Sequence, residues 1–138
     1  MKRLLLIAIC LWGITFCQAQ TLPTEANHFI NTFFPDATET GISFYDHSEM
    51  AYRVELSSDI TVGFNSDGQW IEVESFSSDI TQVLSQQLRQ AIVAHGENPR
   101  NAVRINRNPS TGITKVTYND GLRCEFDANG TFLRKVVE

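Results

Sequence analysis

Residues 52–73 have the sequence YRVELSSDITVGFNSDGQWIEV, and residues 114–135 have the sequence TKVTYNDGLRCEFDANGTFLRK. The two stretches match at a constant offset of 62 residues. The paired positions are Val54 and Val116, Leu56 and Tyr118, Ile60 and Leu122, Val62 and Cys124, Phe64 and Phe126, Gly68 and Gly130, and Trp70 and Phe132. Self-similarity at a fixed offset indicates one supersecondary unit that occurs twice.

Apolar and polar residues alternate along both stretches, as where Cys124 stands between Arg123 and Glu125. A period of two is typical of antiparallel strands that have one apolar face and one solvated face. Gly with Asn or Asp separates the strands, as tight hairpins require, at residues 65–68, 119–121 and 127–130. Residues 57–59, Ser-Ser-Asp, depart from this turn chemistry.

A helical pattern precedes each group of strands. In the first copy Pro23 suits the first helical position, apolar residues recur at spacings of three and four from Ala26 to Phe33, and Pro35 ends the helix. In the second copy the apolar stripe consists of Ile80, Leu84, Leu88, Ala91, Ile92 and His95. That helix begins either near Ser78 or only at Ser85, and it ends before Gly96 and Pro99.

These patterns predict an α+β fold: a tandem repeat of a helix plus about four antiparallel strands, with the helices packed on one face of a curved sheet. We expect three segments, which are a signal peptide at 1–19, a first repeat at 20–76 and a second repeat at 77–138.

The first segment has the pattern of an export signal. Lys2 and Arg3 precede an apolar run that ends at Phe16, and the small residues Cys17 and Ala19 occupy the two positions that a signal peptidase reads before an expected cleavage after Ala19. A bilayer span needs roughly 18 or more apolar residues, so a membrane anchor is disfavoured. A lipoprotein is also disfavoured, because the residues before Cys10 and Cys17 are bulky. We therefore expect a periplasmic or secreted protein without stable membrane insertion, whose remaining cysteine, Cys124, forms no intrachain disulfide.

The order of these motifs resembles that of the bacterial exported PepSY-like family, also called β-lactamase-inhibitor-protein-like. The resemblance rests on the helix end at residues 33–37, on the first strand pair at 52–70 and on its repetition at 119–132. It covers nearly all of the chain after residue 19. It implies a tandem α+β unit with an open sheet face and no catalytic residues. We transfer no inhibitory residue, because fold likeness alone does not place one.

The sequence contains no motif of a metal site or of an enzyme. His28, His47 and His95 have no ligand spacing, so we expect no metal and no cofactor. Asp127 and Asn129 are explained by a hairpin turn rather than by a calcium loop. Cys124 occupies a strand position on the apolar face, which favours a buried, inert thiol over a nucleophile.

Charge is distributed unevenly along a chain of 138 residues that is 42% hydrophobic and has a net charge of -5. Residues 20–78 hold ten acids and one base, whereas residues 79–138 hold six acids and eight bases. An acidic chain argues against a nucleic-acid partner, because binding to phosphates needs a basic surface. The two halves either attract one another or steer a partner of complementary charge.

We therefore predict a non-catalytic exported binding module for a protein or peptide, with an inhibitor-like module as one form of it. The candidate binding residues lie on the open sheet face, in a hairpin loop that runs to Met50, and beside a tight turn: Tyr45, Asp46, His47, Arg53, Glu55, Trp70, Lys115, Thr117, Arg123 and Glu125. For Trp70 a core position is favoured, whereas Tyr45 suits the core and a binding role equally. The alternative function is a periplasmic sensor of a small ligand or metal ion.

Overall fold

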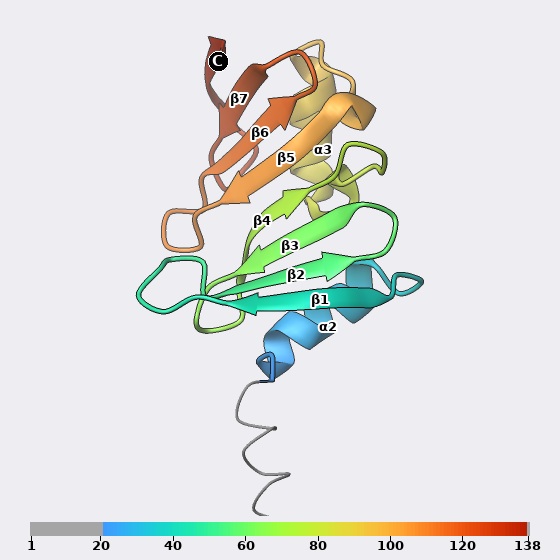
Figure 1. Cartoon of the computed structure of the whole chain (residues 1–138). Helices are drawn as coiled ribbons and strands as arrows, with labels where there is room; N and C mark the ends of the chain where they lie inside the picture. Colours follow the sequence, from blue (N-terminus) through green and yellow to red (C-terminus); the bar gives the residue numbers. More distant parts are fainter. Residues whose placement is uncertain (1–20, 138) are drawn as a thin grey trace, which may run out of the picture.

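The computed structural model describes residues 21–137, which form an α+β fold (Figure 1). The expected signal peptide at 1–19 lies outside the described residues. The elements in chain order are α2 (Thr24–Phe33), β1 (Glu39–Phe44), β2 (Tyr52–Leu56), β3 (Ile60–Phe64), β4 (Trp70–Glu74), the 3-10 turn η1 (Thr81–Val83), α3 (Gln86–Ala94), the 3-10 turn η2 (Pro99–Asn101), β5 (Ala102–Arg107), β6 (Thr114–Tyr118), β7 (Leu122–Phe126) and β8 (Phe132–Val137).

The strands of residues 21–137 form one eight-stranded antiparallel sheet, whose spatial order is the chain order from β1 to β8. The α+β class and the antiparallel sheet are therefore confirmed. One helix precedes each group of four strands, and α3 is inserted between β4 and β5, which nevertheless pair directly (Figure 1). The pairing of β4 with β5 joins the two halves of the sheet, and we call it the seam.

Local sequence explains where the helices begin and end. The chain enters α2 through Pro23, and Pro35 follows its last turn. The Ser85 side chain caps α3 by accepting a hydrogen bond from the backbone N–H of Leu88 at 3.2 Å. The α-helix thus begins after Ser85, and the apolar residues before it form the separate turn η1.

Both helices and one side of the sheet contribute residues to the buried core. A single row of paired positions on this side crosses all eight strands in the order Ile42, Val54, Val62, Val73, Ile105, Val116, Cys124 and Lys135. The six residues from Val54 to Cys124 in this row are fully buried. Phe64 and Phe126 are also fully buried. The core is therefore continuous across the seam.

The same irregularity occurs in both halves of the sheet. A register shift at Phe64 sets this residue opposite Trp70, and a shift at Phe126 sets it opposite Phe132. Bulges of this kind redirect side chains locally. Here they turn an aromatic residue of each following strand toward the helix side, where the Phe29 ring stacks on Trp70 and the His95 ring stacks on Phe132.

The turn at residues 57–59 has left-handed backbone without glycine. Ser58 has φ 64° and Asp59 has φ 60°, whereas the matching turn places Gly121 at φ 86°. Non-glycine residues adopt this conformation at a cost, although Asp is among those that tolerate it. The Asp59 carboxylate offsets part of this cost, because it accepts a hydrogen bond from the Phe76 N–H at 3.2 Å. The unusual turn sequence is thus compatible with a tight hairpin.

Candidate functional site

The side of the sheet opposite the core carries mostly polar residues in two rows, which we call the open face. Residues that pair across antiparallel strands point to the same side, so the rows follow from the register. The first row is Ser43, Arg53, Gly63, Glu72, Asn106, Lys115, Glu125 and Arg134. The second row is Gly41, Glu55, Thr61, Glu74, Arg104, Thr117, Arg123 and Val136.

Opposite charges meet on the open face at the seam. The Arg104 Nε–H donates to Glu74 Oε2 at 2.9 Å, and the same nitrogen lies 3.6 Å from Glu72 Oε1. The Asn106 side-chain amide donates to the other glutamate, Glu72, at 3.3 Å. The two acids belong to the acidic half of the chain and Arg104 to the basic half. The uneven charge distribution of the sequence is thus balanced locally at the seam.

A second charge cluster surrounds Glu125 on the last strands. The Arg134 guanidinium donates two hydrogen bonds to the Glu125 carboxylate, from Nε at 2.9 Å and from Nη2 at 3.2 Å. Arg123 Nε lies 3.8 Å from the same carboxylate. These hydrogen bonds from Arg134 hold the pKa of Glu125 below its ordinary value against the opposing effect of burial, and the charges of Arg134, Lys115 and Arg123 lower the pKa further. Glu125 is therefore an anion at neutral pH, held among cations.

Loops overhang this cluster and enclose a hollow of about 610 Å³ on the open face. Its floor includes Asn106, Lys115, Glu125 and Arg134. Its walls come from the β1–β2 loop at residues 48–49, the β3–β4 turn at 65–66 and the β5–β6 loop at 108–113. The lining is mostly polar and carries both signs of charge. A hollow of this kind can hold a segment of polypeptide by hydrogen bonds and ion pairs.

Close packing fixes the two longer loops. A Cβ atom at Gly63 would lie 2.6 Å from Met50 Cε, so the Met50 side chain rests on the open face over this glycine. A Cβ atom at Gly112 would lie 2.6 Å from Ala128 Cβ, so the 108–113 loop rests on the β7–β8 turn. The Asn108 side chain also accepts hydrogen bonds from the N–H groups of Ser110 and Thr111. Two of the three walls are thus held in place, one by the sheet and one by the β7–β8 turn.

Six of the predicted residues fall on the open face: Arg53, Glu55, Lys115, Thr117, Arg123 and Glu125. Lys115 and Glu125 line the hollow, whereas Arg53 and Glu55 lie on β2, away from its floor. Tyr45, Asp46 and His47 are exposed in the β1–β2 loop, next to the hollow's wall at residues 48–49.

Three of the candidate binding residues are buried: Thr117 is 8% exposed, and the other two are Glu125 and Trp70. Glu125 is only 2% exposed, because Arg134 from the neighbouring strand covers its carboxylate. Trp70 is 8% exposed and lies on the helix side of the sheet, where its ring contacts Phe29 and Arg107. The bulge opposite Phe64 turns Trp70 inward, so it is not an anchor on the open face.

Sequence reasoning missed Arg134, Asn106 and the 108–113 loop as parts of the hollow. Arg134 corresponds to Glu72 at the offset of 62, and this alternation could have placed it on the open face. The Asn-Pro-Ser-Thr-Gly sequence from Asn108 is recognisable as a loop, but its position over β6 to β8 depends on contacts with Ala128.

Burial raises the pKa of the Cys124 thiol, and the nearby Glu97 charge raises it further. Cys124 is fully buried and protonated at neutral pH, as expected for an inert thiol. Among residues 21–137 no group of three or more His, Cys, Asp or Glu side chains is placed to hold a metal ion. Within the same range no helix combines the length and the apolar character that crossing a membrane requires.

The family described as "Putative beta-lactamase-inhibitor-like, PepSY-like" matches residues 50–134, which is more than half of the chain. The chain belongs to this PepSY-like family. The match spans the strands from β2 into β8, and so includes the hollow's floor. Among curated proteins no match to the PepSY-like chain is found.

Solved structures from Bacteroides share the fold of this PepSY-like chain. A "putative periplasmic protein of unknown function" from Bacteroides vulgatus is 26% identical, with a TM-score of 0.66 and coverage of 84% of this chain and 92% of the other. A second periplasmic protein described in similar terms, from the same species, is 22% identical with a TM-score of 0.67, over 83% and 90% of the two chains. A "putative calcium-regulated periplasmic protein" from Bacteroides thetaiotaomicron is 16% identical with a TM-score of 0.69, over 84% and 91%.

Proposed function

We propose that this chain is an exported, non-catalytic binding module that holds a segment of a protein or peptide in the hollow of the open face. The observation that carries the proposal is the hollow itself, about 610 Å³ in volume and walled by anchored loops. Its floor includes Lys115 and Arg134. These side chains can donate hydrogen bonds to a polypeptide backbone and form ion pairs with an acidic side chain. The exposed Tyr45 in the neighbouring loop adds an aromatic contact at the rim.

The location is part of the proposal. The sequence before Gln20 has the pattern of a cleaved export signal, and the structural relative that is 26% identical is described as periplasmic. Inhibition of an exported enzyme is one form that such binding takes. The family description names β-lactamase inhibition, so a β-lactamase is the first enzyme to test.

We also propose that the two halves are copies of one unit. The matched bulges at Phe64 and Phe126 and the equivalent burial of Val54 and Val116 support this interpretation. In each copy the helix packs on its own hairpins, as the contacts of Phe29 with Phe64 and of His95 with Phe126 suggest. The duplication leaves the open face of both copies continuous, and the hollow occupies mainly the second copy's part of it.

Site-specific photocrosslinking in an envelope extract tests the binding proposal. We expect a photoreactive residue at position 115 to form discrete adducts, because this position lies on the hollow's floor. The same residue at position 90, exposed on α3, is the matched control and should form none. Unlabelled protein should compete for the adducts, and the Arg89→Glu variant should compete equally. The Lys115→Glu variant should compete poorly.

Adducts of equal yield at positions 90 and 115 would refute a role for the open face. Equal competition by the Lys115→Glu and Arg89→Glu variants would also refute it. Thermal unfolding of each variant checks that it is folded. A folded variant that competes poorly has lost binding at the hollow.

A further inference from the structure

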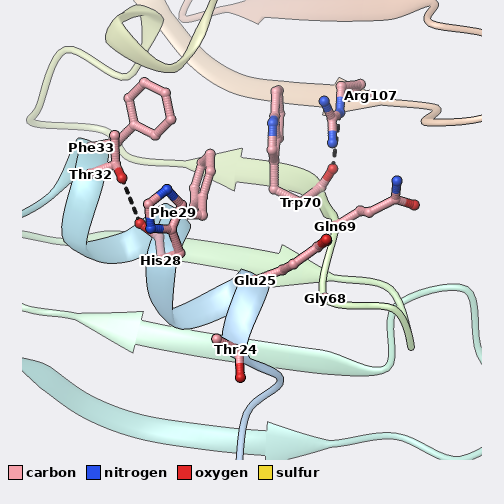
Figure 2. A pocket seen from close by; sticks show the side chains of 10 residues that line it. All are labelled: Thr24, Glu25, His28, Phe29, Thr32, Phe33, Gly68, Gln69, Trp70 and Arg107. Carbon is pink, nitrogen blue, oxygen red and sulfur yellow. Dashed lines mark hydrogen bonds between the residues drawn. The ribbon is translucent and has the colours of Figure 1, made fainter.

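A second hollow, of about 540 Å³, lies on the helix side of the sheet between α2 and the seam (Figure 2). Phe29, Phe33 and Trp70 supply its apolar lining, and Glu25, His28 and Arg107 supply polar groups around them. Small-molecule sites commonly have this size, roughly 300–1,000 Å³, and this combination of an apolar lining with a few polar groups. The proposed function does not use this hollow, although Arg107 lines both hollows.

The aromatic side chains of this hollow are held in place. The Phe29 and Trp70 rings are stacked with centroids 5.7 Å apart, and the Phe29 and Phe33 centroids are 4.9 Å apart. The β3–β4 turn presses against the start of α2, since a Cβ atom at Gly68 would lie 2.8 Å from Pro23 Cβ. The apolar wall is therefore preformed, which reduces the entropy lost when a ligand binds.

Arg107 brings a cation to the edge of this wall. Its guanidinium carbon lies 4.4 Å from the centroid of the Trp70 ring, and its Nε–H donates to the Trp70 carbonyl oxygen at 3.1 Å (Figure 2). Within residues 21–137 Arg107 forms no ion pair with a carboxylate. Burial lowers the pKa of Arg107, because it removes part of the guanidinium from water.

The corresponding place in the second half of the chain is built differently. At the offset of 62, Phe33 corresponds to His95, whose ring stacks on Phe132 at 4.0 Å, and Phe29 corresponds to Ala91. Among the strands formed by residues 21–137, β8 lies at the edge of the sheet, so no further strand of this part supplies an arginine there as β5 does beside Trp70. The combination of stacked aromatics and a cation thus belongs to the seam and is not a by-product of the repeat.

We propose that this hollow binds a small aromatic carboxylate, with its ring against Phe29, Phe33 and Trp70 and its carboxylate on Arg107. The two terminal nitrogens of a guanidinium match the two oxygens of a carboxylate, and the ligand supplies the anion that Arg107 lacks. Glu25 lines the same hollow and repels the ligand's charge. This repulsion lowers the affinity for the carboxylate. Removing the Glu25 charge should therefore strengthen binding, whereas removing the Arg107 charge should weaken it.

Trp70 reports directly on this site by fluorescence. The chain has two tryptophans, so the full chain with Trp12→Phe leaves Trp70 as the sole tryptophan emitter. We expect 3-phenylpropionate to change this emission saturably, and 3-phenylpropanol, which has the same skeleton without the charge, to bind at least tenfold more weakly. Arg107→Met should weaken binding of the acid at least tenfold, Arg107→Lys should weaken it less, and Glu25→Gln should strengthen it severalfold.

Equal binding of the acid and the alcohol would overturn the proposal, and so would unchanged affinity in a folded Arg107→Met variant. If that variant unfolds, the comparison of acid with alcohol and the effect of Glu25→Gln decide the question. Arg89→Glu, on the exposed surface of α3, is the control and should leave the affinity unchanged. Tighter binding of a peptide that ends in phenylalanine than of the free acid would overturn the small-molecule assignment in favour of a peptide terminus.

Discussion

At the scale of single residues, Glu125 determines the charge of the open-face hollow. Lys115, Arg123 and Arg134 face its carboxylate, and the two hydrogen bonds from Arg134 place it among these cations. Without this anion three positive charges would lie close together on β6, β7 and β8. Glu125 thus stabilises the fold and sets how much positive charge the hollow shows to a partner.

The substitution Glu125→Gln should lower the free energy of unfolding by about 1–2 kcal/mol at neutral pH, because it removes charge-assisted hydrogen bonds from a nearly buried site. Since the folded pKa of Glu125 is lowered, its contribution is complete above the ordinary glutamate pKa of about 4.3 and is lost as the pH falls through the lower folded value. Denaturant unfolding at pH 7 and near pH 3 measures the difference in free energy of unfolding between the unmodified protein and Glu125→Gln. This difference should be smaller near pH 3.

The matched control is Glu55→Gln on the same face, where the glutamate is exposed. We expect it to change stability by less than about 0.5 kcal/mol at either pH. A gap for Glu125→Gln that is as large at pH 3 as at pH 7 would show that the carboxylate's charge is not the stabilising feature.

At the scale of elements, the β1–β2 loop is tied to the open face by the contact of Met50 with Gly63. Two backbone hydrogen bonds also hold the loop. The Tyr45 N–H donates to the Ala51 carbonyl oxygen at 2.9 Å, and the Ala51 N–H donates to the Phe64 carbonyl oxygen at 2.8 Å. Glycine weakens a strand interior by roughly 0.5–1 kcal/mol relative to alanine, so its presence at position 63 needs a reason. The close approach of Met50 supplies that reason.

The substitution Gly63→Ala should therefore displace the Met50 side chain and loosen this loop without unfolding the sheet. The atom that must shift is the end of a flexible side chain, so we expect global stability to change by less than about 1 kcal/mol. Hydrogen exchange at the Tyr45 amide should become faster. In a Met50→Ala background the same substitution should have no such effect, and acceleration that persists there would contradict the proposed contact.

The period of two was sufficient to place Arg53, Glu55 and Lys115 on one face, because alternation is a local property of a strand. It could not predict the burial of Glu125, which depends on Arg134 reaching across from β8. It also could not decide the side of Trp70, because a bulge shifts the register by one residue and turns this side chain toward the core. The hollow itself depends on loop contacts between residues that are distant in sequence, such as Gly112 and Ala128.

At the scale of the whole molecule, the acidic and basic halves meet along the seam, where two kinds of interaction join them. On the open face Arg104 pairs with Glu72 and Glu74, and on the core side Val73 lies opposite Ile105. The arginine side chain is 44% exposed, whereas Val73 and Ile105 are fully buried. Exposed ion pairs typically contribute about 0–1 kcal/mol. The two halves should therefore unfold together because of the shared core.

The shared core and the exposed ion pairs should contribute unequally to stability. Val73→Ala should lower the free energy of unfolding by about 2–3 kcal/mol, because it leaves a cavity at a fully buried position. Arg104→Gln should lower it by about 0.5–1 kcal/mol, since the guanidinium is partly solvated. Denaturant unfolding followed by Trp70 fluorescence, which reports on the first half beside the seam, and by far-ultraviolet circular dichroism, which reports on both halves, measures each variant. Coincident transitions by the two probes would show that the halves still unfold as one unit. Separate transitions in the Arg104→Gln variant would mean that the ion pairs couple the two halves, rather than the apolar row through Val73.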